Sequence, residues 1–311
     1  MASADYINQE IKGTQVSFDN ASQIVIEKYA QLPVFSIQVT DQFSELFTST
    51  ESFSAARKVT EQETPDLGTL GDGYAVSMTS DRFAGGFEIT SQDMVKMKDG
   101  TTKVDVYLDR QRDKALKDMK NLFVRNLHLF FNEAFDSGSD YLAPDGAELC
   151  GTHTWNSTGT TFSNAITAKL DSEAVDVALE VGTDFVDAEG KEFPLTYNTI
   201  VVRPNSDNAR MAKKLFAEGI SPTAINDINI YESAVMTIIE TPYITSANKD
   251  YWFMFDSEAQ ESPLYAGVNQ MPQLKDGIKQ NNEAVRHNVE GFWKQGIDNM
   301  PWNILGSDGT T

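Results

Sequence analysis

Residues 148–204 carry the most organised pattern in the chain: a loop, a helix, a turn and a strand, in that order. Its informative pieces are ELCGTHTW at 148–155, SN at 163–164, SEAVDVALEV at 172–181, EG at 189–190, FPL at 193–195 and IVVRP at 200–204. The helical piece places its apolar residues at three- and four-residue spacing, so they share one face: Ala174, Val175, Ala178 and Leu179. Helices alternating with strands in this way predict an α+β sheet domain.

The longest helical signal covers residues 102–135. Residues 103–137 contain neither glycine nor proline, and apolar residues recur at a spacing of three and four. These positions are Met119, Phe123, Leu127, Phe130 and Ala134. A helix of this length would extend on the order of 50 Å, which is typical of the backbone of an elongated domain. The alternative is an ordinary core helix that ends earlier.

Two stretches upstream of that helix predict strands. Residues 74–80 and 83–89 alternate apolar and polar side chains, as strands covered on one side do. We expect them to form a long projecting hairpin that follows an exposed acidic connection at 41–72. Because a two-stranded hairpin is only marginally stable alone in water, it needs a partner surface, which a neighbouring subunit would provide.

Weaker patterns fill the remaining chain. A polar arm precedes a short helix at 21–32, which Pro33 ends, and an extended segment at 34–39. Further along, the sequence predicts a helix at 206–218 and strands at 199–203, 228–231, 235–240, 252–255 and 288–293.

The composition is that of an ordinary globular protein. At 311 residues the chain is long enough for about two compact units. No apolar run approaches the roughly 18 residues needed to span a bilayer, and no signal-peptide pattern is visible at the N-terminus. The single cysteine, Cys150, rules out an intrachain disulfide and suits a reducing compartment, so we expect synthesis in a cytoplasm.

The formal net charge is −21. Electrostatically driven binding of nucleic acid needs clustered Lys and Arg, so this charge argues against it. The simplest interpretation is solubility, since a high net charge disfavours nonspecific association.

Patterns for catalysis or metal binding are weak. The histidines, His128, His153 and His287, are far apart in sequence and do not match a zinc-site spacing. Cys150 and His153 form the only nucleophile-like pair, and their spacing in a loop does not establish the geometry of a dyad. No nucleophile-elbow, Walker-type or calcium-loop pattern occurs. We therefore predict no catalytic, cofactor-binding or metal-binding residues.

The order of motifs in residues 148–204 resembles that of the Mu-like major head subunit family of tailed bacteriophages. The family has a Leu-x-x-x-His loop, a Ser-Asn pair, an Ala-rich helix, a Gly turn and a Pro-led strand, matched here at 149–153, 163–164, 172–181, 190 and 194–204. The similarity continues through 209–216, 226–229, 241–244 and Trp252, and covers about the C-terminal two-thirds of the chain. One departure is Thr154, where the family usually has proline.

The resemblance implies the α+β major capsid fold of tailed phages, of the Hong Kong 97 type. It implies an N-terminal arm at 1–50, an extended β-hairpin loop at 51–90, a peripheral domain at 91–160 and 283–311 with a long spine helix at about 102–135, and an axial domain at 161–282. The implied function is a major capsid (head) protein that self-assembles into the icosahedral shell enclosing a dsDNA genome. The alternatives are another virion structural, decoration or tail protein, and a hydrolase that uses Cys150 and His153.

The same resemblance implies partners and a location. The partners would be copies of the chain in pentamers and hexamers, portal, scaffold and decoration proteins, and packaged dsDNA contacted nonspecifically, with no cofactor and no membrane. The protein would reside in the virion after assembly in the host bacterial cytoplasm. Its negative charge would then give a shell lining that does not grip DNA.

Specific contacts between copies can also be expected. The extended loop would lie on the neighbouring subunit and bury there the apolar faces of Tyr74, Met78, Phe83 and Phe87. Acidic loop segments would meet basic patches, either Lys114, Lys117 and Lys120 or Arg203, Arg210 and Lys213.

Overall fold

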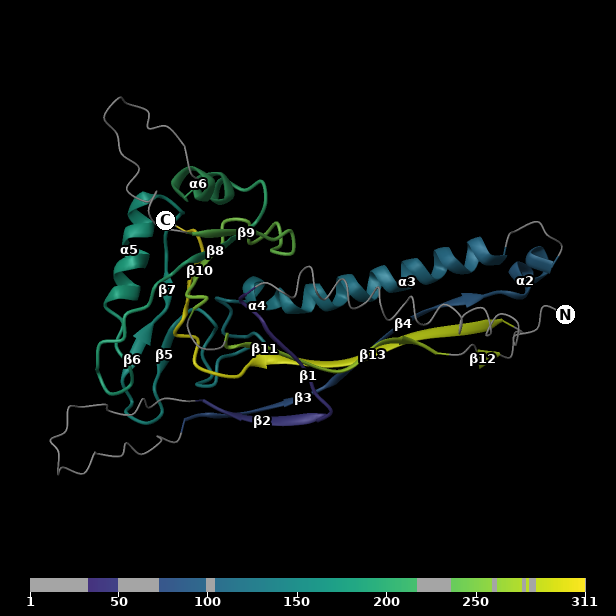
Figure 1. Ribbon diagram of the computed structural model, residues 1–311, viewed down its shortest axis with the longest axis horizontal. Helices are drawn as coiled ribbons and strands as arrows, with labels where there is room; N and C mark the ends of the chain where they lie inside the picture. Colours follow the sequence, from purple (N-terminus) through teal and green to yellow (C-terminus); the bar gives the residue numbers. More distant parts are fainter. Residues whose placement is uncertain are drawn as a thin grey trace, which may run out of the picture. The chain divides into compact units, whose positions relative to one another are not determined.

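The chain folds into two compact units that are interleaved in sequence. The computed structural model describes residues 33–49, 73–98, 104–216, 236–258, 262–275, 278–279 and 284–310 (Figure 1). The first unit contains Met1–Glu45, Met78–Leu127 and Ala266–Gln295, and the second contains Leu46–Ser77, His128–Tyr265 and Gly296–Thr311. Helices and strands occur in both, which confirms the α+β class.

The first unit is built on a sheet whose central strand is β13 (Val285–Ile297). β4 (Asp81–Ile89) pairs antiparallel with it along its whole length, from Ile89 opposite Val285 to Asp81 opposite Trp293. The sheet is completed by β12 (Ile278–Lys279), β11 (Leu264–Leu274) and β1 (Ser36–Val39). From Val285 to Trp293 the side chains of β13 alternate between a buried face and a face that is exposed or half-buried, as a period of two requires.

A long helix covers the buried face of this sheet. α3 (Val104–Leu127) follows α2 (Ser91–Lys98) and lies along β4 and β13 (Figure 1). Three of the predicted apolar positions, Met119, Phe123 and Leu127, are buried. The ring of Phe123 meets that of Trp293 edge-on, with 5.3 Å between centroids.

The predicted helix at 102–135 exists, but it ends earlier than expected. α3 stops at Leu127, and a separate short helix, α4 (Leu129–Asn132), follows. The residues after the break are held by tertiary hydrogen bonds inside the second unit. His128 Nε2 lies 2.7 Å from Thr241 Oγ1, and Asn132 Nδ2 donates to the Tyr243 carbonyl at 3.0 Å. Sequence periodicity carries no information about such bonds.

The predicted pairing of residues 74–80 with 83–89 is wrong, although both strands exist. β3 (Ala75–Thr79) pairs with β2 (Ser44–Thr48), whereas β4 pairs with β13. Only Ser80 separates β3 from β4, and a tight hairpin needs a turn of about two residues or more. The chain therefore passes from one sheet directly into another at Ser80.

The second unit contains a mixed sheet in the order β7 (Ala165–Ile166), β14 (Ile304–Ser307), β10 (Trp252–Phe255), β8 (Thr199–Val202) and β9 (Thr237–Glu240). β10 is antiparallel to both neighbours, while the outer strands run parallel to theirs. Every residue of β8, β10 and β14 is buried, so both faces of the sheet are covered.

Alternate residues of β10 show how the two faces are covered. Trp252 and Met254 join a hydrophobic cluster that includes residues of α5 (Ser172–Thr183) and α6 (Asp207–Phe216). Phe253 and Phe255 point the other way and meet Phe131 of α4, with centroids 5.0 and 5.9 Å apart. A small two-stranded sheet of β5 (Thr152–Thr154) and β6 (Thr161–Ser163) completes the unit.

Most of the other local predictions agree with these elements. Strands predicted at 34–39, 199–203, 235–240, 252–255 and 288–293 appear as β1, β8, β9, β10 and β13, and helices predicted at 172–181 and 206–218 appear as α5 and α6. The predicted helix at 21–32, the strand at 228–231 and residues 50–72 of the acidic connection lie outside the described residues. Within the described ranges, no helix combines the length and apolarity needed to cross a membrane.

Candidate assembly surfaces

Cys150 and His153 do not form a catalytic pair. Cys150 is buried, and burial, with a smaller contribution from the charge of Glu148, raises the pKa of its thiol far above the ordinary range. His153 is also buried, with Nδ1 3.2 Å from Asp145 Oδ2 and Nε2 3.3 Å from the Leu149 carbonyl oxygen. Because the thiolate is the nucleophile, an enclosed and protonated thiol is inert. The hydrolase alternative therefore loses its geometric basis.

His153 has a structural partner in Asp145. Burial, the largest single influence, raises the pKa of this carboxyl, but the hydrogen bond and charge of His153 and the backbone N–H groups of Thr154 and Ala147 together outweigh burial. The pKa of Asp145 consequently lies below its ordinary value. The pair ties the loop before β5 to β5 itself.

The Ser-Asn pair also has a packing explanation, at Asn164. Its Nδ2 donates to the carbonyls of Leu149 and Pro301 at 2.9 and 3.0 Å, and its Oδ1 accepts from the N–H of Gly151 at 2.8 Å. The buried amide thus joins the loop at 149–151 to the segment before β14.

The described ranges hold no group of three or more His, Cys, Asp and Glu side chains placed to bind a metal ion. His128 contacts Thr241 and the ring of Tyr243, and His287 contacts the ring of Phe87 across the β4–β13 pair. Both histidines therefore pack inside the unit to which they belong.

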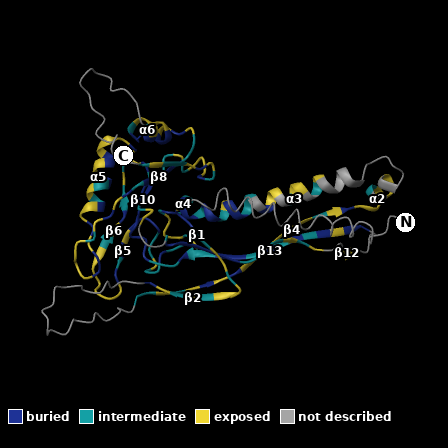
Figure 2. Ribbon diagram, in the orientation of Figure 1, coloured by how far each residue is buried: buried dark blue, intermediate teal, exposed yellow. Residues whose placement is uncertain are grey.

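Exposed apolar side chains are concentrated in one short stretch. The large hydrophobic residues that are exposed, among those described, are Val39, Phe43, Leu46, Val95, Val177, Val186 and Ile278. Scattered single examples are normal on a surface. Val39, Leu46 and Phe43, however, fall within residues 39–46 and are 78%, 72% and 55% exposed. Figure 2 shows the exposed segment at β2, where Leu46 lies.

A set of polar contacts inside the first unit holds the turn at residues 40–45, and we call it the clamp. Asn269 Nδ2 donates to the carbonyls of Thr40 and Gln42 at 3.0 and 2.7 Å, and Ser80 Oγ donates to Asn269 Oδ1. Lys294, whose side chain is fully buried, donates to the Gln42 carbonyl at 2.7 Å. Its Nζ also lies 3.3 Å from Glu45 Oε1.

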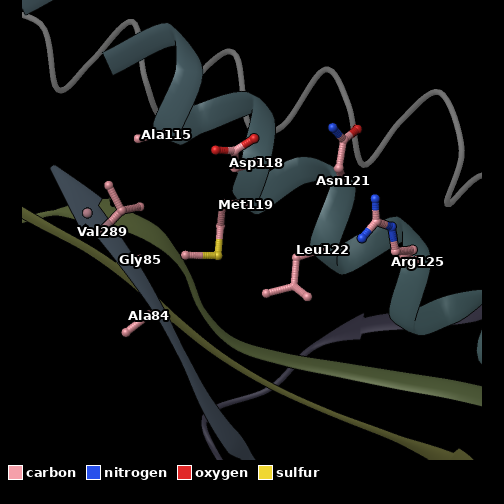
Figure 3. A pocket seen from close by; sticks show the side chains of 10 residues that line it. Ala84, Gly85, Ala115, Asp118, Met119, Asn121, Leu122, Arg125 and Val289 are labelled. Atoms are coloured by element: carbon pink, nitrogen blue, oxygen red, sulfur yellow. The ribbon is translucent and has the colours of Figure 1, made fainter. Parts of the chain in front are cut away.

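A groove lies between α3 and β4 of the first unit, with a volume of about 450 Å³ (Figure 3). Met119 and Leu122 point from α3 toward the strands, and Val289 and the main chain at Gly85 lie opposite them. Asp118, Asn121 and Arg125 line the outer rim. A Cβ placed on Gly85 would meet nothing within 4 Å, so this glycine leaves the groove open.

The opposite face of the β4–β13 pair carries ion pairs. Glu290 lies 2.6 Å from Arg82 Nη2 and 2.9 Å from Lys275 Nζ, and Arg286 pairs with Glu88 at 3.6 Å. The hydrogen bonds from Lys275 and Arg82 hold the pKa of Glu290 below its ordinary value. This face is therefore charged and solvated, in contrast to the face under α3.

The side chains expected to bury against a neighbouring subunit are at least partly covered by their own chain. Met78 is buried, and Tyr74 packs against the cluster of the second unit. Phe83 stacks on Trp293 with 3.8 Å between centroids, and Phe87 lies 5.1 Å from His287. The expected hairpin was wrong, since β4 is an integral strand of the first sheet. Tyr74, Phe83 and Phe87 are half-buried, and their burial on a neighbouring subunit stays a prediction.

The two predicted basic patches differ in their surroundings. Arg210 pairs with Asp207 at 3.1 Å and Lys213 with Glu240 at 2.7 Å, while Arg203 donates to the Ile244 carbonyl. On α3, Lys114 and Lys117 are exposed. Arg210 and Lys213 are exposed as well, so both sets offer cations at the surface.

Comparison with known proteins gives a likeness of fold. The sequence matches no protein-family model and no curated protein sequence. Among solved structures, a chain from Mycobacterium phage Patience aligns with a TM-score of 0.52 at 11% identity, covering 95% of this chain and 87% of that one.

Two further structures are similar to the same extent. A chain from the capsid of an empty GTA particle gives a TM-score of 0.51 at 11% identity, covering 89% of this chain and 88% of that one. A chain from the satellite phage P4 procapsid, which includes the size determination (Sid) protein, gives a TM-score of 0.50 at 12% identity. The alignment covers 95% of this chain and 90% of that one. At these identities the likeness shows the fold alone, which this chain shares with a chain of the GTA capsid and a chain of the P4 procapsid.

Proposed function

We propose that this chain is the major capsid (head) protein of a tailed bacteriophage, and that it self-assembles into the icosahedral shell enclosing the dsDNA genome. The observation that supports this most is the likeness of fold to a chain of the satellite phage P4 procapsid. The alignment covers 95% of this chain and 90% of that one. A fold by itself does not imply a function, since one fold can host many. The surface of the protein must therefore also be consistent with self-assembly.

The surface features agree with a protein that contacts copies of itself. Exposed apolar side chains concentrate at 39–46, where a solitary soluble protein would gain nothing from them. The buried environment of Cys150 removes the leading candidate for enzymatic chemistry. Many weak symmetric contacts of this kind sum to a stable shell.

The domain assignment is part of the proposal. It comprises an N-terminal arm at 1–50, an extended loop at 51–90, a peripheral domain at 91–160 and 283–311, and an axial domain at 161–282. α3 would be the spine helix. α5, α6 and the strands β7, β8, β9 and β10 fall within the proposed axial domain, whereas β14 of the same sheet falls within the proposed peripheral domain. β3 falls within the extended loop, and its partner β2 falls near the end of the N-terminal arm.

The remaining parts of the proposal concern partners and relatives. Pentamers and hexamers of the chain would be accompanied by portal, scaffold and decoration proteins, and dsDNA would be contacted nonspecifically. The protein would reside in the virion after assembly in the host cytoplasm. A closer relation to the Mu-like major head subunit family rests on the motif order at 148–204 alone.

Electron microscopy of the protein, expressed alone and with a candidate scaffold, tests the proposal. Closed icosahedral shells, or pentameric and hexameric rings, are the expected result. Tubes or trimers would instead support a tail or decoration protein. A uniform monomer under both conditions would overturn the capsid function and leave only the likeness of fold.

A further inference from the structure

We propose that Phe43 of one copy inserts into the groove between α3 and β4 of a second copy, and that the clamp presents Phe43 for this contact. The inference rests on the proposed self-assembly and names the residues of one repeated interface. Both halves of the contact, the turn at 40–45 and the groove, belong to the first unit of the chain.

The turn is held rigidly from the inside, which leaves its apolar side chains outside. The Phe43 carbonyl accepts from the Ser80 N–H at 2.9 Å, and the Thr40 N–H donates to the Val268 carbonyl at 3.1 Å. Asn269 and Lys294 hold the carbonyl of Gln42 between them. A side chain on so constrained a backbone loses little further backbone entropy on binding, which favours affinity.

The groove matches an aromatic side chain in size and chemistry. Its volume of about 450 Å³ falls within the range of small binding pockets. The inner wall is apolar, formed by Met119, Leu122 and Val289. Because a Cβ at Gly85 would meet open space, the strand wall lacks a side chain where an incoming ring would lie.

Charges on the two surfaces favour a second copy as the occupant. The chain carries a net charge of −21, so copies repel each other unless cations meet acids locally. Asp41, exposed, is two residues from Phe43, and Arg125, exposed, lies on the groove rim beside Leu122. Asp118 on the same rim would repel Asp41, so Asp41 must approach from the Arg125 end. The turn and the groove are different surfaces, so a head-to-tail contact between them can repeat from copy to copy.

Substitutions on each side of the contact test it independently. A Cβ at Gly85 meets no atom within 4 Å, so Gly85→Leu is expected to place its side chain in the groove. Phe43→Asp removes the apolar ring from a position that is already exposed. Each is expected to raise the protein concentration needed for assembly by about tenfold or more, because an aromatic anchor is lost from every repeated contact. Gly85→Ala should have a smaller effect than Gly85→Leu. Val177→Asp, an exposed apolar site in the second unit, is the control and should assemble like the wild type.

A cross-link identifies the contact directly. In a protein with Phe43→Cys and Gly85→Cys, oxidation of assembled particles should give a ladder of disulfide-linked chains on a non-reducing gel, absent for either single variant. The buried Cys150 leaves little background reaction. Wild-type-like particles without a ladder, or unimpaired assembly of Gly85→Leu, would overturn the contact while leaving the capsid function intact. A wild-type chain that never assembles would instead overturn the proposed function itself.

Discussion

The main sheets of the two units differ in what lies on their faces. In the second unit, β8, β10 and β14 are buried at every position, with α5 and α6 on one side and α4 on the other. In the first unit, β13 has α3 over one face, while the other face carries the ion pairs of Glu290 and the buried amine of Lys294.

This difference indicates that one unit contributes mainly to the stability of the fold and the other mainly to contacts with partners. A sheet covered on both sides gains most from burial and has little surface left for a partner. A sheet covered on one side has polar groups on its other face that can bond to other segments. Lys294 of β13 is such a group, and its bonds in the clamp hold the turn at 40–45. We therefore expect the second unit to dominate the free energy of unfolding and the first unit to govern contacts between copies.

The largest effect is expected for Phe253→Ala in β10. Phe253 is fully buried and meets Phe131, so its truncation should lower the free energy of unfolding by about 3–5 kcal/mol. Urea denaturation of the soluble subunit measures this. Phe292→Ala on the half-buried face of β13 is the matched control, and an equal loss there would contradict the contrast between the sheets.

Lys294→Met tests the clamp. The change leaves Glu45 and the Gln42 carbonyl without their buried partner, which should cost about 1–3 kcal/mol. Hydrogen exchange should speed up locally at residues 40–45 and much less in β10. If the double variant with Glu45→Gln recovers part of the loss, the cost arises from the carboxylate that has lost its cation. Equal rates of hydrogen exchange at residues 40–45 in the wild type and the variant would contradict the proposal that Lys294 positions this turn.

The contribution of Asp145 to stability should depend on pH and be lost in acid. Its folded pKa is lowered, so its stabilisation is fully present above the ordinary aspartate pKa of about 4 and is lost as pH falls through the folded value. Asp145→Asn should therefore lower the Tm at neutral pH and converge with the wild type in strong acid. A difference in Tm that stays constant down to the lowest accessible pH would rule out this linkage.

The smallest effect is expected for Glu290→Gln on the outer face of β13. The ion pairs with Arg82 and Lys275 involve largely solvated cations, so their loss should cost about 1 kcal/mol or less. Added salt should shrink the difference further, because it screens exposed pairs. A loss that is large and independent of salt would mean that this face is desolvated.

Local elements were largely predictable because they depend on spacing within a few residues. The apolar residues of α3, α5 and α6 follow helical periodicity, and the continuous apolar strand at 252–255 is buried on both faces as β10. The spacing of Cys150 and His153 did not establish a dyad, and only the structure shows that both side chains are buried and that His153 contacts Asp145. The Ser-Asn motif was visible too, but its role in joining 149–151 to Pro301 was not.

The amino-acid sequence by itself determined where helices and strands form, which side chains are apolar enough to be buried, and the class of fold that their order resembles. Only the tertiary structure decided that α3 ends at Leu127, that β3 and β4 enter different sheets, and that Lys294 and Asn269 hold a turn more than 200 residues away. The physical reason is that these outcomes depend on hydrogen bonds and packing between distant segments. Such contacts leave no periodic signal in the sequence of either partner.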